Sequence, residues 1–295
     1  MSVRAGAAQT TFRADVAPLI NAHCAGCHRP GGSSSVSLLS YADVRAHARQ
    51  IVQLTERRQM PPWQPEGAPG TFVGDRRLSP AQIATFRRWL DDGLVDGDGP
   101  LPAAPTVSRE WTLGTPDLVL TMPAFELRAD GPDMFRNFVL PVPVATMKYV
   151  RAWEFKPGNA RAVHHATMQV DATGASSRYD EDDQAAGYEG LIAPSARAPD
   201  GFFLDWAPGH RPNVAVPGTA WPLPAASALV MMLHLRPSGK VEPVQASVAL
   251  YFADTPPARV PVMLRLTRQD LDIPAGTAGY VARDSYVLPV DVEVH

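Results

Sequence analysis

Two cysteines and a histidine at positions 24–28 form the segment of this chain best suited to chemistry. It reads Cys24-Ala25-Gly26-Cys27-His28, a C-x-x-C-H motif that is the attachment signature of a c-type haem. Two thiols at this spacing can form thioethers with the two vinyl groups of a porphyrin, and His28 then becomes the proximal iron ligand. The chain contains 2 cysteines in all, so none remains for a disulfide or a separate zinc site.

Two other interpretations of the cysteine pair stay open. A C-x-x-C pair also occurs in thioredoxin-like redox sites and as half of a zinc site. A redox pair usually follows a strand of a βαβ unit, and no such pattern precedes Cys24. Tetrahedral zinc needs two more ligands at short spacing, which His23 and His28 supply only with poor geometry. We therefore expect haem c at this motif.

A second segment, Met60-Pro61-Pro62-Trp63, is expected to complete the haem site. A thioether sulfur is the common ligand opposite a proximal histidine, and it raises the reduction potential. The two prolines fix φ angles and remove N–H donors, so the loop that holds Met60 would be stiff. Trp63 is then expected to lie against the porphyrin. The simpler alternative is that Met60 is a core residue at a helix end.

Short helices must position these residues. Apolar side chains recur every three or four residues in the stretches 12–20, 44–54 and 83–90, which predicts three helices. Ser40 is the expected N-cap of the second helix, and Ser79 begins a capping box for the third. The first hundred residues therefore predict a small all-α cytochrome c domain.

Beyond residue 116 the pattern changes to short runs of Val, Leu, Phe and Tyr between Pro and Gly turns, which is typical of an antiparallel β-sandwich. The strands are expected at 118–122, 135–140, 149–155, 162–170, 228–235 and 246–252, with 171–227 mostly loop. We therefore predict an α + β, multidomain chain. Its parts are a cytochrome c domain at 1–95, a linker at 96–116, a jelly-roll-like β-sandwich domain at 117–255, and the start of a second β-domain at 256–295.

Three histidines in two expected strands form a second candidate site. His164 and His165 are adjacent, and His234 lies in a later strand. Neighbouring side chains of a regular strand point to opposite faces, so the adjacent pair can share a metal only if the strand is bulged or twisted there. Three imidazoles suit Cu or Zn, and Cu where redox chemistry is needed. On spacing alone, a histidine pair in the core or on the surface fits equally well.

Other candidate residues carry less chemistry. One of the adjacent Met231 and Met232 is expected in the core, while the other is a candidate for approach to the metal. His210 is interpreted as a loop residue, and His23 and His47 as surface residues of the haem domain. The acidic cluster at 180–183 is interpreted as part of a solvated loop rather than a calcium site.

The β region resembles the N-terminal domain of the copper type II, ascorbate-dependent monooxygenases, the family of peptidylglycine α-hydroxylating monooxygenase and dopamine β-monooxygenase. The matching segments are Arg161-Ala162-Val163-His164-His165-Ala166, Asp205-Trp206-Ala207-Pro208-Gly209 and Leu229-Val230-Met231-Met232-Leu233-His234. The helical part resembles bacterial relatives in which Cys-x-x-Cys-His-x-Pro-Gly-Gly and then Met-Pro-Pro-Trp precede this module.

This resemblance implies that His164, His165 and His234 hold one type II, electron-transferring copper. In the family a second copper, held by two histidines and a methionine of the next domain, uses O2 to hydroxylate an organic substrate, and this sequence lacks those ligands. The expected function is therefore haem c electron transfer into a copper-dependent monooxygenase module, with no catalytic residue in this chain. The alternative is a non-catalytic periplasmic haem/copper electron carrier; a third interpretation is a structural β-sandwich without copper.

The charge and hydropathy of the chain limit the classes of partner that we expect. The net charge of −3 gives no support for nucleic-acid binding, and no apolar run approaches the roughly 20 residues of a membrane span. The expected partners are an electron-donor protein or small reductant and an unidentified small organic substrate. Covalent haem attachment implies export, so a periplasmic or secreted location is expected. Residues 1–11 lack the apolar region of a signal peptide, and we expect a chain truncated at both ends.

Overall fold

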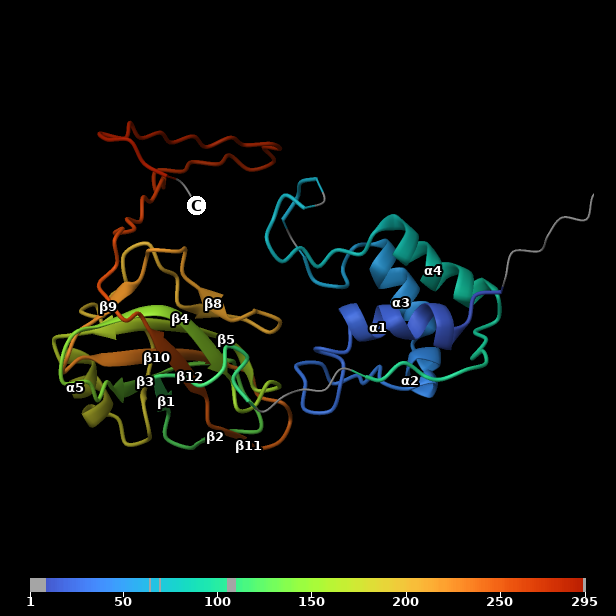
Figure 1. Cartoon of the computed structure of the whole chain (residues 1–295), viewed down its shortest axis with the longest axis horizontal. Coiled ribbons are helices and arrows are strands. Elements are labelled where there is room, and N and C mark those ends of the chain that lie inside the picture. Colours follow the sequence, from blue (N-terminus) through green and yellow to red (C-terminus); the bar gives the residue numbers. More distant parts are fainter. Residues whose placement is uncertain (1–8, 64, 69, 105–109, 294–295) are drawn as a thin grey trace, which may run out of the picture.

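The chain folds as an α+β protein in which N-terminal helices are followed by antiparallel β-sheets (Figure 1). The structure is a computed structural model that describes residues 9–63, 65–68, 70–104 and 110–293. The predicted fold class is thereby confirmed. Within the described residues, no helix is long and apolar enough to cross a bilayer.

The helical region is built from short elements joined by tight turns. They are a π-helical turn η1 (Phe12–Val16), α1 (Ala17–His23), α2 (Tyr41–Ala46), α3 (Ala48–Glu56) and α4 (Pro80–Asp91). Helix α4 begins at the predicted capping box. The Gln82 N–H donates to the Ser79 hydroxyl at 3.2 Å, and the Ser79 N–H donates to Oε1 of Gln82 at 2.8 Å. Two donors at the helix start are thus satisfied by side chains.

The second predicted helix is wrong as a single element, because the chain breaks it at His47 into α2 and α3. Ser40 caps α2 as expected. The buried side chains of Val44, Ala48 and Val52 still follow one face, which explains why the sequence pattern is continuous. At the break, the His47 N–H bonds to the Val44 carbonyl at 3.2 Å, one residue short of an α-helical bond.

The helical core is aromatic, and the start of the predicted linker closes it. The ring of Trp89 is buried and lies 6.0 Å from that of Phe12. The Trp89 indole N–H donates to the Val95 carbonyl at 2.9 Å, and Arg13 pairs with Asp96 at 3.0 Å. The segment that follows α4 therefore packs on the helices, while residues 105–109 lie outside the described residues. The predicted domain boundaries stay a prediction.

The β region contains two larger antiparallel sheets in the described part of the chain. Sheet I contains β1 (Leu118–Thr121), β12 (Ser247–Phe252), β4 (Lys148–Lys156), β8 (Asn213–Val214) and β9 (Trp221–Leu223). Sheet II has the order β6 (Tyr188–Glu189), β3 (Met134–Pro141), β10 (Ala228–Leu235), β5 (Val163–Asp171) and β7 (Asp205–Trp206). A short pair joins β2 (Phe125–Leu127) to β11 (Glu242–Val244), and α5 (Ala175–Asp182) follows β5.

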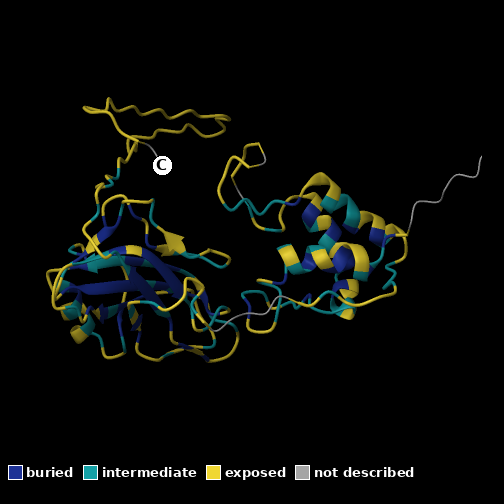
Figure 2. Cartoon of the chain, in the orientation of Figure 1, coloured by how far each residue is buried: buried dark blue, intermediate teal, exposed yellow. Residues whose placement is uncertain are grey.

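The two sheets pack face to face around one shared core (Figure 2). Trp153 and Leu250 of sheet I and Phe138 and Leu233 of sheet II are all buried in it. The chain crosses from sheet II to sheet I and back as it passes through β3, β4 and β5. Alternate residues of each strand point into this core, and the residues between them face outward. The outer face of sheet II is where the histidines lie.

The six predicted strands match β1, β3, β4, β5, β10 and β12 to within a residue or two at each end. The stretch 171–227 is more ordered than predicted, since it carries α5 and β6 to β9. The acidic cluster lies on α5 and its C-terminal cap rather than in a loop. Asp183 there accepts from the buried Arg136 at 2.9 Å.

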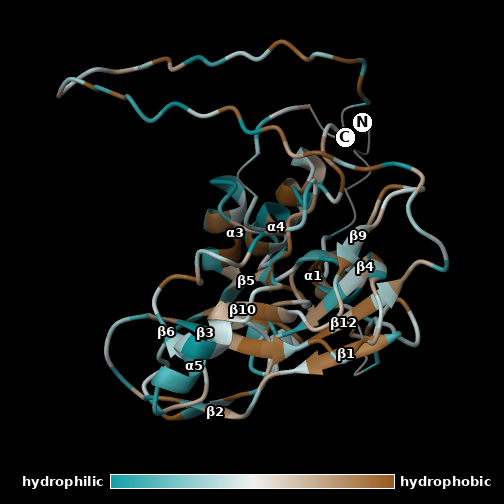
Figure 3. Cartoon of the chain, turned by 90° about the vertical axis from the view of Figure 1, so that its left-hand side faces the viewer, coloured by the Kyte–Doolittle hydropathy of each residue, from teal (hydrophilic) through white to brown (hydrophobic). Residues whose placement is uncertain are grey.

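Beyond β12 the chain leaves the sandwich as a long extended segment (Figures 1 and 3). Within residues 260–293, which the structure describes, there is no helix or strand. Apolar side chains alternate with polar ones and are exposed, for example Val260, Val262 and Val287. The assignment of 256–295 to a second β-domain stays a prediction.

Candidate metal centre

A β-bulge brings the two adjacent histidines to one place. Strands β5 and β10 are antiparallel, and His165 is paired with His234. The next pair is Val163 with Leu235, so His164 is an extra residue with no partner in that ladder. A bulge of this kind bends the strand and redirects a side chain. The strand is therefore bulged at His164, as it must be if His164 and His165 are to share a metal.

The Nδ1 atom of His165 is close to the same nitrogen of both other imidazoles. The Nδ1 atom of His165 lies 3.2 Å from Nδ1 of His164 and 3.2 Å from Nδ1 of His234. Two nitrogens 3.2 Å apart and each about 2.0 Å from an ion would subtend about 105° at it, which suits tetrahedral or trigonal coordination. Among the described residues, this is the one group of three or more His, Cys, Asp or Glu side chains placed to hold a metal ion.

The electrostatics of the cluster favour neutral imidazoles. Burial lowers the pKa of His164, and the nearby charges of His234 and Arg236 lower it further. Burial, then His234 and His164, lower the pKa of His165. A metal ion binds the unprotonated ring, so a group of mutually repelling histidines is prepared to release protons and accept a cation. The site can therefore hold a metal such as copper.

Two neighbours of His234 are functional candidates that sequence reasoning missed. Oδ2 of Asp133 lies 2.8 Å from Nε2 of His234, although the two residues are 101 positions apart. Phe135 stacks on the His234 ring at 4.3 Å between centroids, with 13° between the planes. Phe135 is the register partner of His234 across β3 and β10. Neither contact has a signature in the sequence, because both depend on which strands become neighbours.

The remaining candidates near this sheet are now placed. Met231 is fully buried in the sandwich core, which confirms that one of the two methionines faces inward. Met232 lies on the histidine face of sheet II, two residues before His234, and is half-buried. His210 is exposed in the loop after β7, as expected. Its backbone N–H bonds to the carbonyl of Ala207 at 2.9 Å.

In the helical region, the predicted haem motif forms a single tight turn after α1. The N–H groups of Cys27 and His28 both bond to the Cys24 carbonyl, at 3.1 and 2.9 Å. Nδ1 of His28 lies 3.2 Å from the Val36 carbonyl oxygen. A carbonyl accepts, so Nδ1 carries the hydrogen, and Nε2 is left with the lone pair that an iron ligand needs.

The loop that follows the motif packs directly on it. A Cβ atom on Gly32 would collide with the carbonyl oxygen of Cys27. The N–H of Ser34 donates to the same carbonyl at 3.2 Å, and the N–H of Leu38 donates to that of His28 at 3.0 Å. The Gly-rich loop therefore fixes the conformation of the motif.

The chemistry of Cys24 does not suit the alternative sites. Burial, with a smaller effect from Cys27, raises the pKa of Cys24 to about 12. A thioredoxin-like redox cysteine needs a lowered pKa, because the thiolate is the reactive form. Among the described residues, the cysteines also join no group of potential metal ligands with His23 or His28. His23 instead contacts Nε2 of Gln82 at 3.2 Å.

Met60 and Trp63 follow α3, and the described contacts do not join them to the cysteine turn. Met60 is 38% exposed, and its N–H bonds to the Leu54 carbonyl at 3.2 Å. The indole nitrogen of Trp63 is buried and has no hydrogen-bond partner among the described residues. An orphaned buried donor of this kind fits a site that a bound group with acceptor oxygens would complete. The roles of Met60 and Trp63 stay predictions.

Side chains from two loops of the helical region lie beside the β region. Ser33 and Ser35, from the loop after the cysteine turn, line a cavity of about 340 Å³ together with His164. Arg161 and Arg236 line the same cavity. The loop after Trp63 also reaches across, since the Arg76 guanidinium closely approaches Gly209. The turn that carries the cysteines is therefore followed by a loop that lies beside a histidine of the metal centre.

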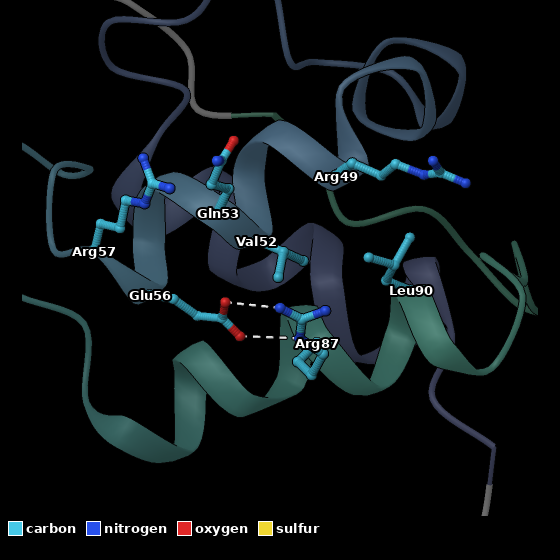
Figure 4. A pocket seen from close by; sticks show the side chains of 7 residues that line it. All are labelled: Arg49, Val52, Gln53, Glu56, Arg57, Arg87 and Leu90. Atoms are coloured by element: carbon cyan, nitrogen blue, oxygen red, sulfur yellow. Dashed lines mark hydrogen bonds and ion pairs between the residues drawn. The ribbon is translucent and has the colours of Figure 1, made fainter.

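A larger cavity of about 640 Å³ lies over α3 and α4, and Figure 4 shows the side chains that line it. None of the predicted haem or metal ligands lines it. Glu56 and Arg87 span it with two hydrogen bonds, of 2.9 and 2.7 Å. Both side chains are largely exposed, so this pair contributes little to stability.

No known protein family and no curated protein matches this sequence. The assignment of chemistry therefore depends on the geometry of the two candidate sites.

Proposed function

We propose that this chain is an electron-transfer protein in which a haem c, attached at Cys24 and Cys27, passes electrons to one copper ion held by His164, His165 and His234. We further propose that it serves a copper-dependent monooxygenase module that hydroxylates an organic substrate with O2. Export to the periplasm or outside the cell belongs to the same proposal, because covalent haem attachment takes place there.

The observation that carries the proposal is the convergence of three Nδ1 atoms at the β5 bulge. Nδ1 of His165 lies 3.2 Å from Nδ1 of each of the other two rings, and one ligand atom of each ring lies within 4.8 Å of the others. Imidazole ligands suit copper among the metals that change oxidation state. When bound, haem iron and copper would each exchange one electron at a time.

The residues of the cysteine turn support the haem half. His28 has its Nδ1 hydrogen engaged by the Val36 carbonyl, so its Nε2 is available to bind iron. The unpaired indole N–H of Trp63 offers a donor to a bound group. Met60 would supply the sulfur ligand on the opposite face of the haem.

The contact between the two regions supports electron transfer between the two proposed groups. The cavity lined by Ser33, Ser35 and His164 brings the loop after the cysteine turn beside a ligand of the copper site. His164 is the most exposed of the three histidines, and it is the one that lines this cavity with the two serines. In this proposal, a haem bound at the cysteine turn would lie close enough to the copper to exchange electrons with it.

The described residues hold one candidate metal group, and this favours a second candidate function, that of a non-catalytic haem/copper electron carrier. The two proposals share both sites and differ only in what receives the electron. In both, an electron-donor protein or small reductant supplies the electrons. In the first they are consumed with O2 as an organic substrate is hydroxylated, whereas in the second they pass to another redox protein.

Copper analysis of purified, metal-reconstituted protein tests the metal centre. We expect one copper per wild-type chain, with a type II signal in electron paramagnetic resonance, and its loss in His164→Ala. His210→Ala is the matched control, since it removes an exposed histidine that lies outside the cluster. Equal copper content in wild type and His164→Ala would exclude this site.

Rapid mixing then tests electron transfer. With the haem reduced and Cu(II) bound, one electron should leave each haem and reduce one copper, and this phase should disappear in His164→Ala. Unchanged haem oxidation kinetics in that variant would contradict the proposed route. Copper- and O2-dependent hydroxylation by this chain alone would overturn the assignment of electron supply without catalysis.

A further inference from the structure

We propose that Asp133 is the positioning residue of the metal centre: it holds the hydrogen of His234 on Nε2, so that Nδ1 of this ring is the atom that binds the metal. This inference deepens the proposed copper site and rests on it for its metal-binding consequences. Asp133 precedes β3, in a segment of the sequence in which nothing indicates a role in metal binding.

The hydrogen bond decides the tautomer. Oδ2 of Asp133 lies 2.8 Å from Nε2 of His234, and a carboxylate oxygen can only accept. Nε2 must therefore donate its hydrogen, and the lone pair of the neutral ring is on Nδ1. That atom lies 3.2 Å from Nδ1 of His165, inside the cluster. Without Asp133, the neutral ring is free to place its hydrogen on Nδ1, where it would block coordination.

The strand geometry explains why this aspartate reaches this ring. Asp133 lies directly before β3, and Phe135 is paired with His234 across β3 and β10. Residues two apart on an extended chain point to the same side, so Asp133 and Phe135 both face the histidine side of sheet II. Phe135 covers the face of the ring, at 4.3 Å, while Asp133 holds its edge. Together they restrict both rotation and flipping of the imidazole.

Arg236 lies near the same carboxylate but contributes little to holding it. Its Nε lies 3.7 Å from Oδ2 of Asp133, and both side chains are about half exposed. An ion pair at that distance and exposure is weak. The side chain of His234, in contrast, is 12% exposed, so its hydrogen bond to the carboxylate is shielded from water on the imidazole side.

An acceptor on the outer nitrogen of a histidine ligand fixes its orientation and raises its basicity, and its removal typically costs 10- to 100-fold in metal affinity. We therefore expect Asp133→Ala to weaken Cu(II) binding by about 10- to 100-fold in competition titrations. A changed copper hyperfine splitting should accompany the loss. Asp133→Asn keeps an acceptor oxygen of the same shape without the charge, so an intermediate loss is expected.

Asp130→Ala is the matched control. Asp130 is exposed three residues earlier in the same segment, and its backbone carbonyl accepts from Nε of Arg128 at 3.0 Å, a bond that the substitution keeps. The control removes the same charge without touching His234, so its copper affinity should stay within about twofold of wild type. A loss equal to that of Asp133→Ala would assign the effect to net charge and overturn the inference.

The tautomer itself gives a readout that needs no copper. Nitrogen-15 chemical shifts of labelled histidines in the metal-free protein should show His234 with its hydrogen on Nε2 in wild type, and a mixture of tautomers in Asp133→Ala. A wild-type chain that binds no copper but shows this tautomer would remove the proposed copper function and leave the positioning role intact. Unchanged tautomer and copper affinity in Asp133→Ala would overturn the inference alone.

Discussion

The two candidate sites of this molecule are built in opposite ways. In the helical region, the cysteines and His28 are contiguous, and hydrogen bonds within ten residues hold their turn. In the β region, His165 and His234 are 69 residues apart and meet only because β5 and β10 are neighbours in the right register. The first site is thus fixed by local chain geometry, and the second by the packing of the whole sandwich.

This difference decides which substitutions should disrupt each site. A local turn is disturbed by a change inside its own loop and is insensitive to distant substitutions. A site formed across strands depends on register, since a shift by one residue would turn every histidine to the other face of the sheet. Variants confined to one region should therefore leave the other site intact, and the following experiments test that separation.

The largest effect is expected from the double substitution Cys24→Ala with Cys27→Ala. Both thioethers would be lost, so covalent haem should fall from one per chain to none, as measured by haem staining of the denatured protein. Copper uptake at His164, His165 and His234 should remain at the wild-type level, because no ligand of that site has changed. Loss of copper together with haem would show that the two sites are not independent.

The comparison also explains which features could be predicted from the sequence. Helix α4 could be predicted because Ser79 and Gln82 carry their capping box within four residues, and β10 because its apolar run has clear ends. The break at His47 could not, since Val44, Ala48 and Val52 keep one continuous apolar face across it.

The candidate sites follow the same division. The histidine cluster could be proposed only on condition of a bulge, because a regular strand separates His164 from His165. Asp133 could not be predicted from the sequence, since its contact with His234 exists only once β3 and β10 are paired. Local hydrogen bonds leave sequence signatures, whereas contacts across strands depend on a register that one sequence does not specify.

A stability effect of about 3 kcal/mol is expected from Asp171→Ala at the end of β5. This buried carboxylate accepts from the N–H of Ser176 at 2.7 Å and from the N–H and hydroxyl of Thr173, at 2.8 and 2.7 Å. The substitution would leave the buried Ser176 N–H without its acceptor. Chemical denaturation at pH 7 measures the change, and the helical region should keep its stability while the β region loses stability.

The same carboxylate gives a pH dependence of known sign. Burial alone would raise the pKa of Asp171, but the hydrogen bonds from Ser176 and Thr173 outweigh it and hold this pKa below its usual range. A depressed folded-state pKa contributes stability above the unfolded value, about 3.9, and this is lost as the pH falls toward the folded value. The difference in the free energy of unfolding between wild type and Asp171→Ala should therefore decrease below about pH 4. A difference that increases in acid would contradict this.

A somewhat smaller effect is expected from Gly32→Ala in the helical region. The added Cβ would collide with the Cys27 carbonyl oxygen, and overpacking of this kind costs about 1–3 kcal/mol. Calorimetric unfolding of the haem-loaded protein measures it. Gly26→Ala is the control, since Gly26 lies inside the motif itself and its added Cβ would meet nothing within 4 Å. Equal destabilisation by both would show that the loop does not fix the turn.

The smallest effect is expected from Phe135→Leu, the substitution that tests the cross-strand site most finely. Leucine keeps the apolar cover but loses the stacking on His234, an aromatic contact worth about 0.5–1.5 kcal/mol. Copper affinity should therefore fall by about 2- to 12-fold, less than in Asp133→Ala. The exposed Phe203, on the loop before β7, supplies the matched control Phe203→Leu. Copper binding that is weakened more by Phe135→Leu than by Asp133→Ala would contradict this order. The orientation of the His234 ring would then depend on stacking with Phe135, and so on the register of β3 against β10, more than on the hydrogen bond from Asp133.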